Sequence, residues 1–199
     1  SGYHANLALM STVVGDGDGV ASDALNHASI IDGLRLSKAK RQIIEHGRAN
    51  GILPNTRMVV VEGLYSMDGD VLDLASYRGH HWLAVDEAHA FGVMGPNGRG
   101  AAAEQGVEPD FLVGTLGKAI GTYGAFVVGP NSLRDLLISK GRSFIFTTGL
   151  PEALVSASLA ALKLANDERR QMLRANVDRL RSGLADLGIQ ALGHAHIVP

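Results

Sequence analysis

The sequence contains no cysteine, so disulfide bonds and cysteine-ligated zinc sites are excluded, while the redox compartment stays open. It also carries little net charge. A formal charge of −2 gives no sign of a nucleic-acid partner or of an anionic membrane surface. No leader with a charged and then an apolar part opens the chain, and no apolar run approaches the ~18 residues of a membrane span. We therefore expect a cytoplasmic protein that has no nucleic-acid or membrane partner.

The composition is that of a folded protein. With 199 residues, of which 46% are hydrophobic and 19% charged, the chain is long enough to bury a core, and its length favours one domain with room for an appendage. It begins with SGYHAN and no methionine, and it ends with GHAHIVP, where an apolar strand starts. We expect it to be the central portion of a larger protein.

Short apolar runs alternate with helical or glycine-rich connections. The runs are Met58–Val61, Leu83–Val85, Phe111–Gly114 and the GAFVVG segment that follows Tyr123. Continuous apolar runs of this length are typical of strands buried on both faces of a sheet. The alternation predicts an α/β protein with a mostly parallel, doubly wound sheet flanked by helices.

From Pro151 onward the sequence is rich in alanine and leucine and lacks internal proline, which predicts one long helical stretch. Apolar residues recur along it at steps of three and four, which defines one helix face: Leu173, Val177, Leu180, Leu184 and Leu187. We expect this face to pack against the sheet domain or a neighbouring domain. Five such positions are too few to indicate a coiled coil.

Lys118 follows the predicted strand at 111–114 and comes directly after Gly117. A solvated lysine needs no such setting, whereas a phosphate-binding or covalent lysine does. The loop is not a Walker A motif, because Gly114 and Gly117 are too close together and Ala119 stands where a Ser or Thr should hold magnesium.

The sequence VDEAHAFG, 85–92, contains the letters DEAH of a helicase motif. A DEAH-box-like ATPase is therefore an alternative from another class. It is disfavoured because such an enzyme needs a Walker A loop upstream of the box, and Lys118 lies downstream. What remains is an acid, Asp86, at the carboxyl end of a strand, where open α/β sheets bind ligands, with His89 three residues later. A buried carboxylate there needs a cationic partner or strong hydrogen bonds.

The segment SGYHAN contributes a glycine at the start of a helix, whose free N–H groups suit a phosphate. One ligand would use all three features: a phosphate for the helix start, a protonated ring nitrogen for Asp86 and a carbonyl for Lys118. Pyridoxal 5′-phosphate (PLP) has these groups, and a lysine Schiff base with an acidic pyridinium partner is its usual signature.

Two patterns hint at a metal but are incomplete. Asp16 and Asp18 in GDGDG suggest a calcium loop, yet Val20 occupies the next ligand position and no glutamate closes the loop. His194 and His196 form an H-x-H pair that has no third ligand nearby in the sequence. We expect no metal site.

Three longer motifs carry a resemblance to a known family: GLYSMDGD (63–70), VDEAHAFGVMGPNGRG (85–100) and TLGKAIGTYGAFVVGP (115–130). Together they resemble the α-oxoamine synthases, fold-type-I PLP enzymes that join an amino acid to an acyl-CoA with loss of carbon dioxide. The similarity runs over nearly the whole chain. It implies a fold-type-I large domain at 1–150, incomplete at its N-terminus, linking helices at 151–190, and the start of a small C-terminal domain at 191–199.

The resemblance also implies roles for catalytic residues. Lys118 would form the Schiff base and act as acid and base at the substrate Cα. Asp86 would pair with the pyridine nitrogen, and His89 would hydrogen-bond the phenolic oxygen of the ring. His27, in NHAS, would stack on the ring face.

Further residues would hold the cofactor, again by resemblance. Gly2 and Tyr3 would line it at the helix start, Thr115 would reach the phosphate, and Ser66 would lie near the ring oxygen. Thr147 or Thr148 would contact the phosphate of a partner subunit, which implies a homodimer with its active sites at the interface.

The segments SGYHAN, DALNHASIIDG, GTYGAFVVGP and FIFTTGLPEA most resemble the biotin-pathway branch of the family, which condenses L-alanine with a pimeloyl-type acyl-CoA. Glycine C-acetyltransferase, 5-aminolevulinate synthase and serine palmitoyltransferase share the longer motifs and stay open as alternatives. The connections at 37–56 and 74–82 are shorter than is usual in the family, and the family's N-terminal and C-terminal substrate contacts are absent. A shortened protein that binds PLP without turnover is therefore a further alternative.

Overall fold

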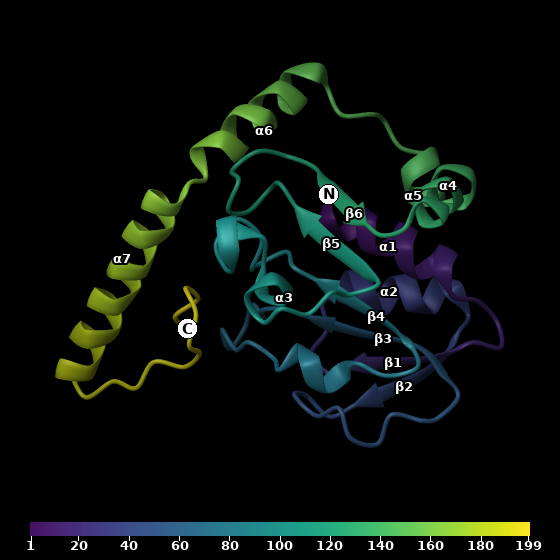
Figure 1. Ribbon diagram of the computed structural model, residues 1–199, viewed down its shortest axis with the longest axis horizontal. Helices are drawn as coiled ribbons and strands as arrows, with labels where there is room; N and C mark the ends of the chain where they lie inside the picture. The colour runs from purple at the N-terminus through teal and green to yellow at the C-terminus, as the bar shows by residue number, and fades with distance from the viewer.

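The computed structural model describes residues 1–199 and contains one six-stranded sheet with helices packed against it (Figure 1). The strands lie in the order β2-β1-β3-β4-β5-β6. The first five strands of the chain are parallel to their neighbours, and β6 runs antiparallel to β5. This confirms the predicted α/β class with a mostly parallel sheet. The strand bounds are β1 Gly19–Asp23, β2 Lys40–Ile44, β3 Thr56–Glu62, β4 Trp82–Asp86, β5 Phe111–Thr115 and β6 Ala125–Val128.

Helical segments separate β1 from β2, β3 from β4 and β4 from β5, whereas β2 leads to β3 and β5 to β6 without one. None of the helices combines the length and the apolar character that crossing a membrane would require. The α-helices are α1 Gly2–Val13, α2 Ala28–Ser37, α3 Ala101–Glu104, α4 Asn131–Lys140, α5 Arg142–Ile145, α6 Glu152–Leu164 and α7 Asp167–Asp186, and two short 3₁₀ helices are η1 Leu74–Tyr77 and η2 Pro96–Gly98.

Helices α1 and α2 cover one face of the sheet. Leu9 and Met10 of α1 and Ile30 of α2 are buried in one apolar cluster with Met58 of β3. The two helices approach closely because α2 carries Gly33, where a β-carbon would lie 2.8 Å from the β-carbon of Met10. This close contact fixes the start of α1 relative to the carboxyl ends of the strands.

The opposite face has a thinner cover. The segment 74–82 forms a single 3₁₀ turn, η1, instead of a full helix. Its Leu74 and Tyr77 are nevertheless buried against Val59 and Leu83, and Ile197 from the C-terminal segment packs on the same cluster. The connection at 74–82 and the C-terminal segment therefore together cover this face of the sheet.

The helical stretch expected after Pro151 forms two helices, with a break at Ala165 and Asn166. Asn166 causes the break, because its side-chain oxygen caps α7 by accepting the N–H of Arg169 at 3.0 Å. The two helices extend away from the sheet (Figure 1). Leu180 and Leu187, on the predicted apolar face, are 51% and 76% exposed.

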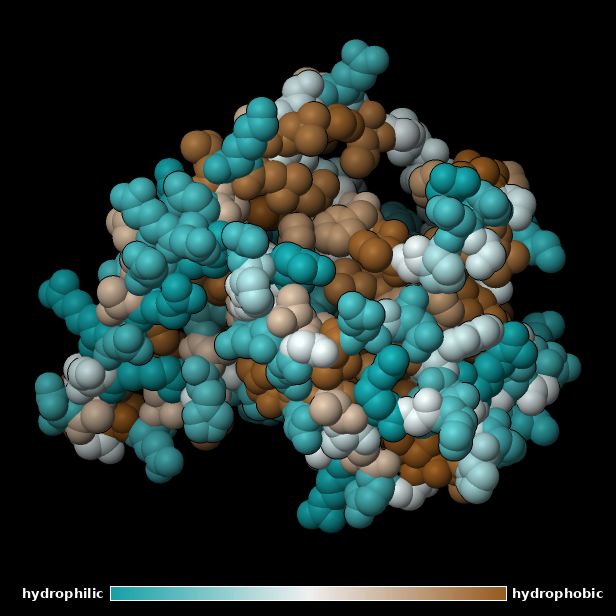
Figure 2. Space-filling view, in the orientation of Figure 1, coloured by the Kyte–Doolittle hydropathy of each residue, from teal (hydrophilic) through white to brown (hydrophobic).

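Hydrophobic side chains also gather over α6 (Figure 2), where the exposed ones include Val155, Leu159, Leu162 and Leu164. The expected packing of this helical stretch is therefore only partly made within the chain.

Glu87, the second letter of DEAH, is a structural residue. It is fully buried, and its carboxylate accepts the N–H groups of Ala101 at 2.9 Å and Ala102 at 2.7 Å, where α3 begins. We predict that Glu87→Ala lowers the free energy of unfolding by about 2–4 kcal/mol, because two buried N–H groups lose their acceptor. Urea denaturation measures this loss, and Glu104→Ala, an exposed acid of α3, serves as the control. Equal stability of both variants would show that Glu87 has no structural role.

Candidate active site

Acidic residues end three neighbouring parallel strands. Asp23 ends β1, Glu62 ends β3 and Asp86 ends β4, and all three are buried. Glu62 and Asp86 are direct partners in the register of β3 and β4. In open α/β sheets ligands bind outside the carboxyl ends of the strands. The candidate site therefore lies at an edge of the sheet where three buried carboxyl groups are gathered.

The carboxylate of Asp86 has two hydrogen-bond donors. Nδ2 of Asn6 donates to it at 2.6 Å, and the N–H of Ala88 donates at 2.8 Å. Burial raises the pKa of Asp86, while these hydrogen bonds and the charge of Lys118 act in the opposite direction. Asn6 also donates to the hydroxyl of Ser29 at 3.0 Å, so it joins α1, α2 and β4. The sequence motif SGYHAN contains Asn6, but its role depends on a contact that the sequence does not reveal.

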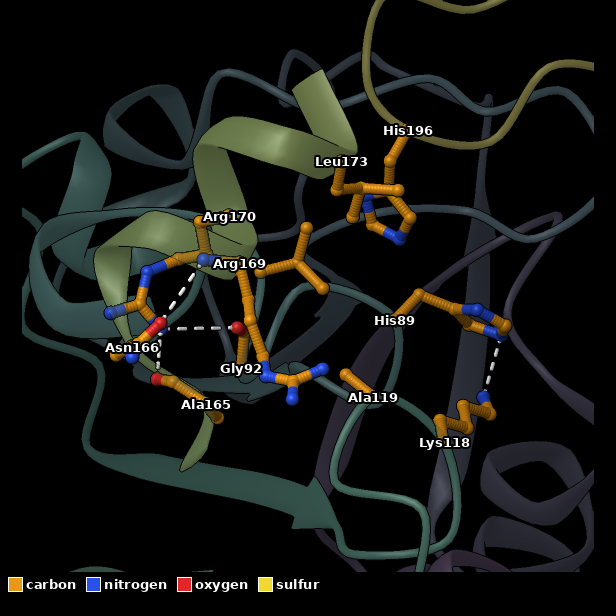
Figure 3. Close-up of a pocket in the computed structure, with 11 residues that line it drawn as sticks. His89, Gly92, Lys118, Ala119, Ala165, Asn166, Arg169, Arg170, Leu173 and His196 are labelled. Atoms are coloured by element: carbon orange, nitrogen blue, oxygen red, sulfur yellow. Dashed lines mark hydrogen bonds between the residues drawn. The ribbon is translucent and has the colours of Figure 1, made fainter. Parts of the chain in front are cut away.

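Lys118 and His89 form a direct pair. Nζ of Lys118 lies 2.6 Å from Nε2 of His89, and the two side chains line one cavity (Figure 3). Burial and the nearby charge of Lys118 lower the pKa of His89 to about 4, so its neutral ring can accept a hydrogen bond from the ammonium group. Burial also lowers the pKa of Lys118, although Asp86 and Glu62 oppose this shift. A lowered pKa favours the neutral amine, which is the nucleophilic form.

Thr115 and the start of α1 lie side by side. A β-carbon on Gly2 would be 3.6 Å from the β-carbon of Thr115. Thr115 Oγ1 donates to the carbonyl of Gly124 at 3.1 Å and accepts the N–H of Gly117 at 3.2 Å. As at the start of any α-helix, the first N–H groups of α1, at Gly2 and Tyr3, have no acceptor within the helix. Gly2, Tyr3 and Thr115 are therefore brought together, at a helix start that suits an anion.

His27 lies at the N-terminus of α2 with its ring exposed. Its backbone N–H donates to Oε1 of Glu62 at 2.6 Å, and its Nδ1 accepts the N–H of Ser29 at 3.2 Å. The ring of Tyr3 lies edge-on to it, with 6.5 Å between the ring centroids. Glu62 thus fixes the backbone of a ring that stays free to contact a ligand. Sequence reasoning missed Glu62, although its place at the end of a buried strand was a usable signal.

Of the predicted cofactor residues, only His89 and Lys118 line the Lys118 cavity. Ser66 is exposed in the turn at 66–68. Thr147 and Thr148 are exposed and line a separate cavity of about 510 Å³, which Ser1 and Gly124 also line. Their proposed contacts to PLP, including the one to a partner subunit, stay predictions. Across the structure, no group of three or more His, Asp or Glu side chains is arranged to hold a metal ion.

Comparison with known proteins agrees with this geometry. The sequence model of a family described as aminotransferase class I and II matches residues 1–199. The chain belongs to this family. Its relatives include 8-amino-7-oxononanoate synthases from Methylococcus capsulatus, 44% identical over 205 residues with 94% of this chain and 53% of the relative covered, and from Anaeromyxobacter sp. strain K, 46% identical with 94% and 51% covered. The chain spans about half the length of these curated relatives.

Solved structures give the same result. A serine palmitoyltransferase from Sphingomonas wittichii superimposes with a TM-score of 0.92 at 35% identity, covering 100% of this chain and 54% of that one. The 8-amino-7-oxononanoate synthase of Francisella tularensis gives 0.87 at 33% identity, covering 100% and 62%. A serine palmitoyltransferase from S. paucimobilis with bound PLP and myriocin gives 0.91 at 34% identity, covering 100% and 56%. These matches confirm the resemblance to the PLP-dependent α-oxoamine synthases and the fold-type-I large domain.

The burial of Glu62 yields a testable pH dependence. Burial and the charge of Asp86 raise the pKa of Glu62 to about 8, well above its ordinary value of 4.5. Below about pH 4.5 the group is protonated in both the folded and the unfolded chain, so it costs nothing. Between 4.5 and 8 the unfolded chain ionises first, and the stability falls as pH rises.

We predict that Glu62→Gln makes the chain more stable at pH 8 by on the order of 2–4 kcal/mol, and that this gain disappears near pH 4. The glutamine oxygen can still accept the N–H of His27. Urea denaturation across this pH range tests the prediction, with the exposed Glu108→Gln as the matched control. A loss of stability at pH 8, or a gain that does not change with pH, would contradict it.

Proposed function

We propose that this protein is a PLP-dependent acyltransferase of the α-oxoamine synthase type. It joins L-alanine to a pimeloyl-type acyl-CoA and yields an α-amino ketone, CoA and carbon dioxide, as in biotin biosynthesis. The observation that carries the proposal is the pair of Lys118 and His89, 2.6 Å apart, beside the carboxyl end of the strand that carries Asp86. The relatives named 8-amino-7-oxononanoate synthase support the choice of substrates.

The residues at the site fit PLP. Asp86 is a buried carboxyl group whose hydrogen-bond donors, Asn6 and Ala88, are both neutral, so a protonated ring nitrogen would add a directly bonded positive partner. Oδ1 of Asn6, beside it, is buried without a hydrogen-bond partner. The first turn of α1 offers N–H groups for the phosphate, next to Thr115. The Thr115 hydroxyl would have to turn from the carbonyl of Gly124 in order to donate to a phosphate.

When bound, PLP supplies an electron-accepting ring that stabilises negative charge at the Cα of an attached amino acid. Each side chain has a separate task around it. Asp86 would keep a proton on the ring nitrogen, and His89, neutral at pH 7, would hydrogen-bond the phenolic oxygen of the ring. Lys118, as the neutral amine, would hold the cofactor at its carbonyl carbon and would take up and return the proton at the substrate Cα. The exposed ring of His27 would stack on one face of the cofactor ring and exclude water from it.

The proposed organisation follows the same family. Residues 1–150 form the cofactor-binding large domain, 151–190 the linking helices and 191–199 the start of a small domain. A homodimer would place Thr147 or Thr148 against the partner's phosphate, and both residues are exposed as this requires.

Other candidate functions rest on weaker observations. Because serine palmitoyltransferases are among the structural neighbours, condensation of a different amino acid with a different acyl donor is an alternative function. Because the chain spans about half of each relative, PLP binding without turnover is a further alternative. A DEAH-box-like ATPase is disfavoured because Glu87 is buried against the start of α3 and is not free to activate water.

The first test is an absorption spectrum after PLP is added, followed by borohydride reduction and peptide mass mapping. We expect a yellow band, with the reduced cofactor fixed on Lys118 and lost in Lys118→Ala. Lys140→Ala, a change in an exposed lysine of α4, should leave the label in place. No band, or label scattered over surface lysines, would show that the proposed function is wrong for this chain.

A second prediction concerns Asp86. We expect Asp86→Asn to weaken PLP binding at least tenfold, because the ring nitrogen loses the carboxylate that keeps it protonated. The exposed Asp135→Asn should bind PLP as the original chain does. Titration followed by the absorption band measures both affinities, and equal affinities would remove Asp86 from the site.

A further inference from the structure

Every charged side chain that lines the cavity of Lys118 is a cation. The cavity measures about 300 Å³ and lies between the Lys118 loop, the first turn of α7 and the C-terminal segment (Figure 3). No aspartate or glutamate is among its lining residues. The charged or titratable residues that line it are His89, Lys118, Arg169, Arg170 and His196.

The two arginines of this cavity differ in whether their guanidinium groups already have hydrogen-bond partners. Arg170 is buried and fully engaged, because its guanidinium donates to Asp167 and to the carbonyls of Ala165 and Gly92. Arg169 forms no ion pair and no side-chain hydrogen bond; only its backbone N–H is bound, by Asn166. Figure 3 shows its guanidinium extending toward Ala119, beside Lys118. Arg169 is therefore the cation of this cavity that a ligand can use.

His196 reaches the same cavity from the other end of the chain. Its segment is held by Arg181, which donates to the carbonyls of Leu192, Ala195 and Ile197, and by the N–H of His194, which donates to Gly69. Nδ1 of His196 is buried and has no hydrogen-bond partner. Burial lowers the pKa of His196, which favours the neutral form of its ring. A buried polar atom without a partner, in a cavity, indicates a group that is supplied from outside.

We propose that Arg169 and His196 form a carboxylate-binding subsite beside Lys118. The planar guanidinium of Arg169 can bind a carboxylate through two parallel hydrogen bonds, and a neutral His196 can donate a third. This inference rests on the proposed function and deepens it, because the carboxylate has two sources in that reaction. One is the α-carboxylate of the amino acid, and the other is the terminal carboxylate of the acyl chain.

Calorimetric titration of the PLP-loaded chain distinguishes these sources. The ligands are L-alanine, pimeloyl-CoA and heptanoyl-CoA, of which the last lacks only the terminal carboxylate. We expect Arg169→Gln to weaken one carboxylate ligand about 10- to 100-fold, as for a lost hydrogen bond to a charged group. Arg169→Lys should restore part of this loss, and His196→Ala should weaken the same ligand about 2- to 10-fold. Arg174→Gln, on another face of α7 and outside the cavity lining, is the matched control and should change nothing.

Each outcome has a definite meaning. A loss for L-alanine alone assigns the subsite to the amino acid, and a loss for pimeloyl-CoA but not heptanoyl-CoA assigns it to the acyl chain. Equal losses for both thioesters, with L-alanine unchanged, would overturn the proposal, because CoA phosphates would then be the ligand. Unchanged binding in Arg169→Gln would overturn it as well.

Failure of the proposed function is separable from failure of the subsite. The same variants are titrated with pimelate, a dicarboxylate, in the absence of PLP. A chain that shows no PLP band but binds pimelate in an Arg169-dependent way would contradict the proposed function and retain the subsite. A chain that binds PLP but shows no Arg169-dependent binding of any carboxylate would contradict only the subsite.

Discussion

The fold depends on compensating the buried carboxylates at the carboxyl edge of its sheet. Asp23, Glu62 and Asp86 end adjacent strands, and each would be costly to bury without donors. The donors come from elsewhere in the sequence. Asp23 accepts the N–H groups of Leu25 and Gly47 and lies 2.8 Å from Nδ1 of His46, whose Nε2 lies 2.6 Å from Asp70.

The same requirement places the residues of the candidate site. Asn6 must reach Asp86, so α1 starts over the edge of the sheet. The N–H of His27 must reach Glu62, so α2 starts there too. Two helix starts are thereby gathered around the end of β4. The site therefore lies where the buried carboxyl groups of the sheet require cations or hydrogen-bond donors. Lys118 is the ammonium group whose charge acts against the raised pKa of both Glu62 and Asp86.

The sequence predicts the regular parts of this arrangement well. Strands such as Met58–Val61 are continuous apolar runs that fit only the inside of a parallel sheet, and Lys118 and His89 are recognisable by motif. The break at Asn166 was not predictable from periodicity, because a single capping side chain interrupts an otherwise helical stretch. Glu62 and Asn6 were missed because their importance comes from register and from a contact over 80 residues of sequence.

The break between α6 and α7 also has a mechanical consequence. Arg170 fastens the first turn of α7 to the carbonyl of Gly92, whereas the rest of the helix is exposed along most of its length. A helix of 20 residues is about 30 Å long, so a rotation of about 10° at this anchor moves its far end by about 5 Å. Arg169, the residue next to this anchor, moves by less than about 1 Å in the same rotation. The start of the helix thus brings a charge to the cavity of Lys118, and its far half is tied through Arg181 to the C-terminal segment, so a displacement of either end is passed to the other.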